Sequence, residues 1–302
     1  MEINRENMKT LFTGFSNAYN TGIGLVPPMY ERIAMTIPSS SRENLYAWLR
    51  DIPAMREWLG DRIINNLSLE SYRIENKSFE STVSVKCSVI EDDQYGVYDT
   101  LFTLLGENTA RHPNDLTFGL LNEGYTAPCY DGKNFFDTDH PVLDEKGKEQ
   151  SISNFMGGTE TAWYLACTSR SIKPLIFQKR QPAELVELSS PSSHNVFMKG
   201  EFIYGVDARY NVGFGLWQLM IASKQPLTGE NYAAARAALQ GMTKDHGGTM
   251  ALTADLLVVP QTLEAEGRRI LNAELVGVGG TTETNIWKGS AELLVCPWLK
   301  ES

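Results

Sequence analysis

The segment that decides the fold is VSVKCSVIEDDQYGVYDTLFTLLGENTARHPNDLTFGLLNEGY, residues 83–125. Its first part alternates between apolar and polar side chains from Val83 to Val89, which is the period of a strand with one solvated face. After an acidic run, the apolar residues recur at helical spacing as far as Leu121. We therefore predict a long strand that leads into a long helix, and this helix ends at Gly124.

Two residues inside the predicted helix affect its course. Asp99 is placed to cap the first turn, because a carboxylate oxygen accepts hydrogen bonds from free backbone N–H groups there. Pro113 lacks an N–H group, so it should kink or divide the helix. We predict a kink at residues 111–113.

Composition limits the classes of protein that this chain can be. Its 302 residues suffice for one large domain or two smaller ones, and 42% hydrophobic with 21% charged residues is typical of a globular protein. No apolar run is long enough to span a bilayer, and no secretory signal is apparent. The four cysteines form no CxxC pair, which favours buried thiols in a reducing compartment. A net charge of −10 argues against a protein that wraps nucleic acid.

The N-terminal half contains three segments that should not form a core by themselves. Residues 1–38 contain one short amphipathic helix and then several prolines, so we expect an arm that docks elsewhere in the chain or on a neighbour. A tryptophan-rich patch with Trp48 and Trp58 forms either a local core under a loop or a contact surface. Residues 68–90 are predicted to form a polar β-hairpin with Asn76 and Lys77 at its tip.

The C-terminal half alternates strands and helices. Residues 161–225 are rich in strand patterns, and an alanine-rich helix is predicted over residues 230–240. A buried strand at residues 256–259, a helix at 263–275 and a last strand at 293–295 follow.

Few residues have a pattern that indicates chemistry. Asp137, Asp139 and His140 could hold a divalent ion, but such residues more often make turn contacts before a proline. Cys129 and His140 are close in the sequence, although a buried inert thiol is the better interpretation of Cys129. No HExxH, GxSxG or phosphate-loop motif occurs. The residues therefore predict no catalytic, cofactor-binding or metal-binding site and favour a structural protein over an enzyme.

Several longer segments resemble one known family when they are taken together and in order. They include LFTGFSNAYN (11–20), REWLGDR (56–62), FESTVSVKCSVIEDDQYGVY (79–98), PCYDGKNFFDTDHP (128–141), KPLIFQKR (173–180), YGVDARYNVGFGLWQ (204–218), SKQPLT (223–228) and AELLVCPWL (291–299). The chain resembles the major head subunit of Mu-like bacteriophages, the T protein family of the Mu capsid. Each segment alone would be weak evidence, whereas the ordered set is specific.

The resemblance implies an α+β protein with the Hong Kong 97-type phage capsid fold. It implies an N-terminal arm at residues 1–44, an extended inter-subunit loop (the E-loop) within 45–95, a peripheral domain with a long spine helix at 96–245, and an axial domain with the C-terminal strand at 246–302. The strand patterns in 161–225 suggest a permuted order of strands in the peripheral domain. Residues 161–225 would refute this idea by forming a separate compact domain.

The function implied is that of a major capsid protein. Copies would assemble as hexamers and pentamers into an icosahedral shell around double-stranded DNA, in the host cytoplasm, without a cofactor or a membrane. Separate scaffold, protease, portal and decoration proteins are the implied partners. A cargo-enclosing nanocompartment of the same fold and a metal-dependent hydrolase are the alternatives. Subunit contacts are predicted at residues whose aromatic rings could equally fill the core, or which lie at the hairpin tip: Phe12, Phe15, Trp48, Trp58, Asn76 and Lys77.

Overall fold

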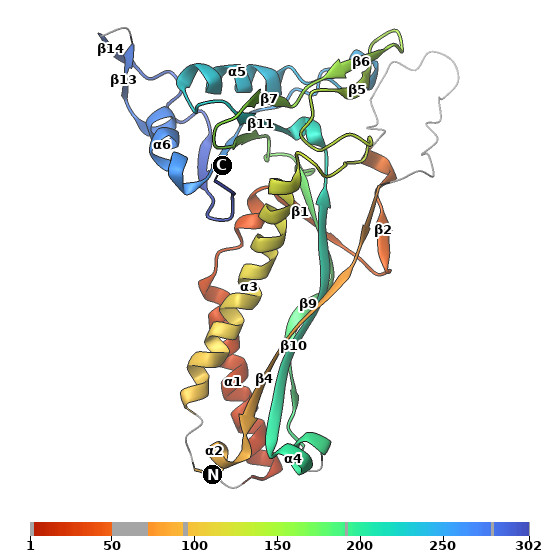
Figure 1. Cartoon of the computed structure of the whole chain (residues 1–302), viewed down its shortest axis with the longest axis vertical. Coiled ribbons are helices and arrows are strands. Elements are labelled where there is room, and N and C mark those ends of the chain that lie inside the picture. Colours follow the sequence, from red (N-terminus) through yellow and green to blue (C-terminus); the bar gives the residue numbers. More distant parts are fainter. Residues whose placement is uncertain (1–2, 50–71, 93–95, 191–192, 279–280, 302) are drawn as a thin grey trace.

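The structure is a computed structural model that describes residues 3–49, 72–92, 96–190, 193–278 and 281–301. The chain is elongated, with a narrow lower body and a broader upper body that are joined by the helix α3 (Val97–Glu123) and by long strands (Figure 1). Within the described residues, no helix has both the length and the apolar character needed to cross a membrane.

The elements follow one another in an order that mixes helices and strands along the whole chain. They are α1 (Arg5–Leu25), η1 (Met29–Arg32), β1 (Ala34–Pro38), β2 (Glu43–Leu45), η2 (Ala47–Leu49), β3 (Arg73–Glu75), β4 (Lys77–Lys86), α2 (Cys87–Glu91), α3, β5 (His140–Leu143), β6 (Glu149–Ile152), β7 (Phe155–Gly158), β8 (Trp163–Ala166), β9 (Leu175–Leu188), α4 (His194–Lys199), β10 (Glu201–Phe214), η3 (Trp217–Leu219), β11 (Met220–Lys224), α5 (Gly229–Gln240), η4 (Asp245–Gly247), β12 (Leu256–Val259), η5 (Gln261–Leu263), α6 (Glu264–Asn272), β13 (Leu275–Val278), β14 (Thr281–Thr284) and β15 (Glu292–Val295).

The lower body is built on a four-stranded sheet with the order β1-β9-β10-β4. Strand β10 pairs antiparallel with both β9 and β4 and alternates along its length between buried and less buried side chains, as a strand with one covered face should. Helices α1 and α3 pack on each other and cover that face (Figure 1). The buried residues between helices and sheet are Met8, Leu11, Phe15, Tyr19, Val85, Ile90, Phe102, Leu105, Phe202, Tyr204 and Val206.

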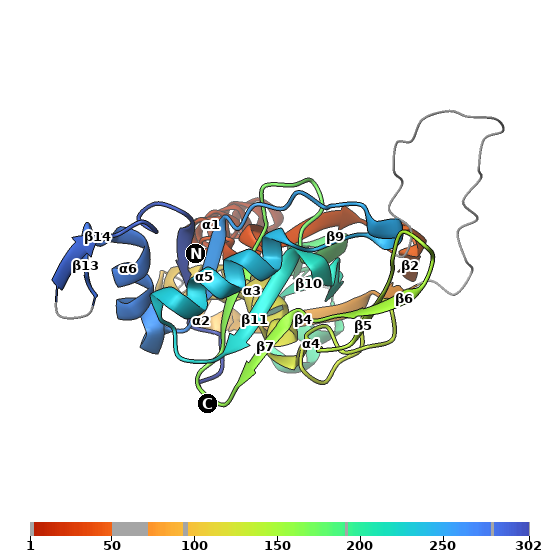
Figure 2. The same cartoon turned by 90° about the horizontal axis from the view of Figure 1, so that it is seen from above.

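The upper body contains a five-stranded sheet with the order β15-β12-β8-β11-β7. All four residues of β8 and all four of β12 are buried, because these continuous apolar runs lie in the middle of the sheet and are covered on both faces. Helix α5 packs on β8 and β11, and α6 packs on β12 and β15. Seen from above, the two-stranded hairpin β13–β14 extends at one end of the molecule and β2 lies toward the other (Figure 2).

The N-terminal arm docks within its own chain. Asn4 caps α1 by accepting a hydrogen bond from the Asn7 backbone N–H at 2.9 Å, and α1 then contributes Met8, Leu11 and Phe15 to the lower core. An arm with this role cannot be removed without exposing that core. The structure thus decides between the two docking sites that the sequence left open for residues 1–38.

The predicted hairpin over residues 68–90 is wrong. Strand β3 pairs with β2, and β4 pairs with β10 over ten residues, so β3 and β4 are not partners. Asn76, the expected tip, is buried and donates hydrogen bonds to Ser39 Oγ and the Ser41 carbonyl. The strand also ends at Lys86 rather than Val89, because the chain turns there into the short helix α2.

The long helix is present, but it is not divided at its proline. α3 runs unbroken from Val97 to Glu123 with Pro113 inside it, so the helix is not divided there, and the kink at residues 111–113 stays a prediction. The helix also begins earlier than predicted, after Gly96, which places Asp99 in the first turn rather than at the cap. An acidic side chain in the first turn still interacts favourably with the helix dipole.

The strands of residues 161–225 do not form a separate compact domain. β8 and β11 belong to the five-stranded sheet, whereas β9 and β10 form the centre of the four-stranded sheet. The five-stranded sheet therefore combines strands from both sides of the predicted boundary between residues 245 and 246. The chain passes between the two bodies several times.

Candidate functional site

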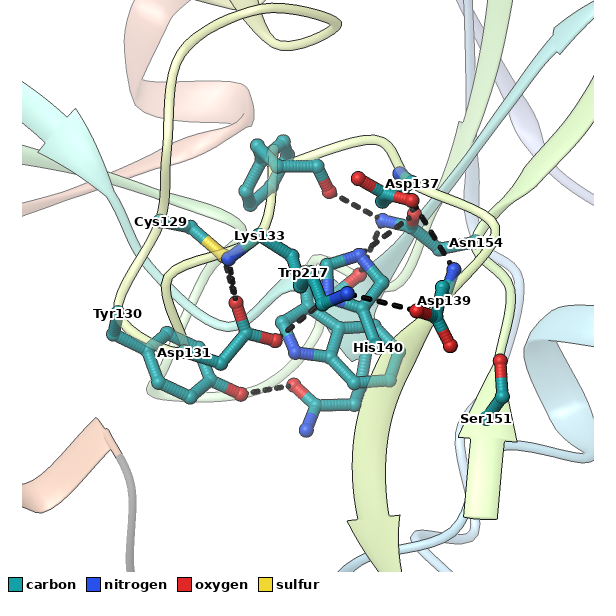
Figure 3. A network of polar contacts seen from close by, with 12 residues as sticks. Cys129, Tyr130, Asp131, Lys133, Asp137, Asp139, His140, Ser151, Asn154 and Trp217 are labelled. Carbon is teal, nitrogen blue, oxygen red and sulfur yellow. Dashed lines mark hydrogen bonds and ion pairs between the residues drawn. The ribbon is translucent and has the colours of Figure 1, made fainter. Parts of the chain in front are cut away.

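The three residues predicted as a possible metal site do not converge. The Asp137 carboxylate accepts hydrogen bonds from the backbone N–H groups of Thr138 at 2.7 Å and Asp139 at 3.2 Å, which is a local turn contact. Asp139 is exposed and forms an ion pair with Lys133 at 2.7 Å. His140 is buried and contacts Asp131 and Asn154 instead (Figure 3). The turn interpretation is therefore the correct one for Asp137.

His140 is the centre of this buried network. Its Nδ1 lies 2.7 Å from Asp131 Oδ2, and its Nε2 lies 3.2 Å from Asn154 Oδ1. The imidazole ring also stacks on Trp217, with 3.9 Å between ring centroids and an interplanar angle of 10°. The histidine thus joins the start of β5 to the 129–133 turn, to the residue before β7 and to η3 (Figure 3).

The orientation of the Asn154 amide is fixed by its other partners. Its Nδ2 donates to the Phe135 carbonyl at 2.7 Å, and its Oδ1 accepts from the Asp137 backbone N–H at 3.0 Å. Both nitrogens of His140 therefore face oxygen acceptors.

Cys129 and His140 both contact Asp131, which connects them. Cys129 Sγ donates to Asp131 Oδ1 at 3.0 Å, and burial raises the pKa of this thiol far above its usual range. Burial also raises the pKa of Asp131, but hydrogen bonds from His140, Cys129 and the Lys133 N–H group outweigh burial and lower it overall. A protonated thiol is a poor nucleophile and a poor metal ligand.

The cluster of Cys129, Asp131 and His140 is therefore best explained as a structural network. These are the three side chains in the described part of the chain whose ligand atoms lie close enough to hold a metal ion, yet each already bonds another member of the cluster. Sequence reasoning missed Asp131 as a member. The Asp131–Gly132 pair predicts a turn, and this turn places the Asp131 carboxylate beside Cys129.

The residues predicted to contact neighbouring subunits occupy different environments. Phe15 is buried within its own chain and stacks on Phe102 with 4.2 Å between ring centroids. Phe12 is partly buried beside Tyr204. In this structure Phe15 and the buried Asn76 offer no surface to a neighbour, and the intrachain core is the better interpretation for Phe15.

The remaining predicted contacts stay predictions. Lys77 is exposed at the start of β4. The side chain of Trp48 and the whole of Trp58 lie outside the described residues.

The structure reveals exposed apolar residues that the sequence reasoning did not single out as contacts. Val97 at the start of α3 is 78% exposed, and Phe197 in α4 is 85% exposed. Leu101 and Leu104 continue the exposed row on α3. The sequence indicates such residues, because α3 contains more apolar side chains than one buried helix face can hold.

Comparisons with known proteins agree with this description of a structural subunit. The family described as Mu-like prophage major head subunit gpT matches residues 8–299. The major capsid protein of Escherichia phage Mu is 37% identical over 305 residues, covering 99% of this chain and 100% of the relative. The Mu-like prophage FluMu major head subunit of Haemophilus influenzae is 38% identical over 288 residues, covering 93% and 94% of the two chains.

Solved structures show the same fold. A chain from the procapsid of bacteriophage JBD30 superposes with a TM-score of 0.85 at 37% identity, covering 98% of this chain and all of that one. A chain from the JBD30 capsid gives a TM-score of 0.76 at 29% identity, covering 91% and 92%. The fold is therefore the α+β Hong Kong 97-type capsid fold, and the relatives are structural proteins rather than enzymes. The chain belongs to the Mu-like prophage major head subunit family.

Proposed function

We propose that this chain is the repeating subunit of an icosahedral phage head, assembled as hexamers and pentamers around double-stranded DNA. The observation that carries the proposal is the match to a procapsid chain along almost the whole length of this protein. The exposed apolar residues of α3 and α4 support it, because large apolar side chains on a surface commonly mark contacts with other proteins. Weak contacts that are repeated in every copy stabilise a closed shell.

The charge of the chain is compatible with a container for DNA. A net charge of −10 gives the chain an overall repulsion from the phosphate backbone. A shell subunit with this charge can enclose DNA without binding it tightly or reading its sequence.

The partners of the chain follow from the same proposal. The solved JBD30 capsid is decorated with trimers of a minor capsid protein, so a decoration protein is a reasonable partner here too. We further propose a separate scaffold, a protease and a portal, with assembly in the bacterial cytoplasm and a final location in the virion. Trp48, Trp58, Phe12 and Lys77 are proposed as contacts between subunits.

The test is the content of purified particles. Particles from an induced lysate should contain this chain as their most abundant protein, running near 33.7 kDa, together with nuclease-protected double-stranded DNA. Particles filled with an enzyme instead of DNA would identify a nanocompartment. Heads that form normally after the gene is interrupted would overturn the proposal.

A further inference from the structure

The lower end of the molecule presents large apolar side chains to solvent. Phe197 of α4 is 85% exposed, and Met198 beside it is 63% exposed. Leu188, the last residue of β9, is 47% exposed at the same end, because α4 connects β9 to β10 (Figure 1). Exposed apolar residues that gather in one place typically mark an interaction surface. We call Leu188, Phe197 and Met198 the apolar tip.

Helix α4 is fixed to the rest of the lower body. Val196 packs against the lower core. Gly200 ends the helix in the left-handed conformation, with φ of 65°, and its carbonyl accepts a hydrogen bond from the Cys87 backbone N–H at 2.8 Å. A side chain on a fixed element can bind without the entropy cost of first ordering its backbone.

The apolar tip itself has no charged residue. The sequence from Leu188 to Met198 contains no Asp, Glu, Lys or Arg, although these residues make up 21% of the chain. Lys199 follows directly, but it is about 60° around the helix from the core-facing Val196, whereas Met198 is about 160° away from Val196. Lys199 therefore lies closer to the body of the subunit than Met198 does.

The charges that surround the apolar tip are of both signs. Glu201 of β10 is opposite Lys86 of β4, so these two charges compensate each other. Glu187 is opposite the buried Tyr204 and emerges from the face of the sheet that the helices cover. Helices α1 and α2 contribute further charged residues of both signs to the lower end: Arg5, Glu6, Lys9, Glu91 and Asp92.

This pattern suits contact between identical surfaces. Where copies meet on a rotational axis, each residue on the axis faces the same residue of its neighbours. A charged residue there would face its own charge, which is unfavourable, whereas an apolar residue buries an identical apolar residue. The apolar tip also lies at the end of the elongated lower body (Figure 1), so copies can meet there end to end without collision of their upper bodies.

We propose that the apolar tips of neighbouring copies pack together around a rotational axis. Phe197 and Met198 of each copy contact the same two residues of the others, and the contact removes these side chains from water. The partner at this surface is therefore another copy of the same chain. The inference rests on the proposed function, which supplies the neighbouring copies.

Cysteine cross-linking in assembled particles tests whether the apolar tip meets itself. In particles of full-length Phe197→Cys or Met198→Cys, a short thiol-specific cross-linker should join two copies and give a band at twice the mass of the chain. The parent chain is the first control, because Cys87 is only partly buried and the other three cysteines are buried. Lys146→Cys, in an exposed turn, is the control for chance encounters between exposed thiols.

A charge experiment tests the same contact without a cross-linker. Phe197→Asp and Phe197→Lys should each reduce the yield of closed particles about tenfold, because each places like charges together on the axis. Co-expression of the two variants should restore much of the yield, since opposite charges then meet. Phe197→Leu should assemble like the parent chain. Thermal melting should show that all the variants fold, because the side chain of Phe197 is 85% exposed.

The outcomes separate this contact from the proposed function. If the unmodified chain forms no particles with its partners, the proposed function fails. If particles form but neither cysteine variant gives more dimer than Lys146→Cys, the tips do not meet. The contact is also wrong if the charged variants assemble normally, if co-expression recovers nothing, or if the variants lose only a decoration protein from otherwise normal shells.

Discussion

At the scale of single residues, the network around His140 ties separate segments of the chain together. Asp131 accepts hydrogen bonds from Cys129, His140 and the Lys133 backbone. Removing one partner of a buried hydrogen bond leaves the other group unsatisfied, which costs free energy. The network is thus a stabilising device, and its contribution should be measurable in the folded subunit.

Asp131→Asn should destabilise the subunit at pH 7 by about 2 kcal/mol, because the amide has one acceptor oxygen in place of the two that contact Cys129 and His140. Chemical denaturation followed by tryptophan fluorescence measures this change. Asp139→Asn is the matched control, since it removes a carboxylate whose ion pair with Lys133 is exposed. An equal loss of stability in both variants would show that burial of the pair is unimportant.

The same carboxylate makes stability depend on pH. The pKa of Asp131 in the folded chain is below its ordinary value of 3.8, so the contribution of Asp131 is fully present at higher pH and is lost as the pH falls through the folded pKa. As the pH falls below 4, the melting temperature of Asp131→Asn should therefore decrease less than that of the parent chain. A melting temperature with the same dependence on pH in both proteins would contradict this.

Residue-level reasoning from the sequence succeeded where contacts are local. The turn role of Asp137 could be predicted, because its partners are the next two residues. The link from His140 to Asp131, Asn154 and Trp217 could not, because it depends on how four separate segments fold together. Spacing in the sequence does not carry that information.

At the scale of elements, α1 and α3 meet at two glycines. A Cβ on Gly106 would lie 2.1 Å from the Tyr19 carbonyl oxygen, and one on Gly22 would lie 2.0 Å from the Thr103 carbonyl oxygen. Real side chains do not fit at such distances, so the helices can approach only because both positions are glycine. Helix α1 of the arm contributes to the lower core only because it can lie this close to α3.

Gly106→Ala should destabilise the subunit by about 2 kcal/mol through overpacking. Alanine favours a helix by about 1 kcal/mol over glycine, so a loss would be caused by contact with α1. Gly119→Ala on the same helix is the control, because nothing lies within 4 Å of its added Cβ, and it should stabilise the protein. The account would be contradicted if the melting temperatures of both variants were higher than that of the parent chain.

Removing residues 1–24 should unfold the lower body rather than simply prevent assembly. The truncation deletes Met8, Leu11, Phe15 and Tyr19, all of which are buried. Circular dichroism and limited proteolysis of the truncated chain should show a loss of structure beyond the deleted helix. A protease-resistant remainder with an unchanged melting temperature would mean that the arm adds little to the core.

The errors at this scale have one physical cause. Alternation predicts a strand but does not name its partner. The sequence therefore predicts that β4 pairs with the adjacent β3. In the structure β4 pairs with β10, more than a hundred residues later. Pro113 shows the related limit for helices, because packing on both sides of α3 can preserve a helix that its sequence would interrupt.

At the scale of the whole molecule, the fold and the function were predictable because the family segments extend along nearly the entire chain. The arrangement of two bodies was not, since each sheet collects strands from distant parts of the sequence. The sequence does not show which side chains of the lower body are exposed, because that depends on the pairing of the strands and on which side of each helix is covered.

The most direct test of the central claim is a cryo-electron microscopy reconstruction of particles that contain this chain. The account predicts an icosahedral shell whose density is filled by repeated copies of this fold. A shell built from another protein, with this chain absent from its density, would contradict the account.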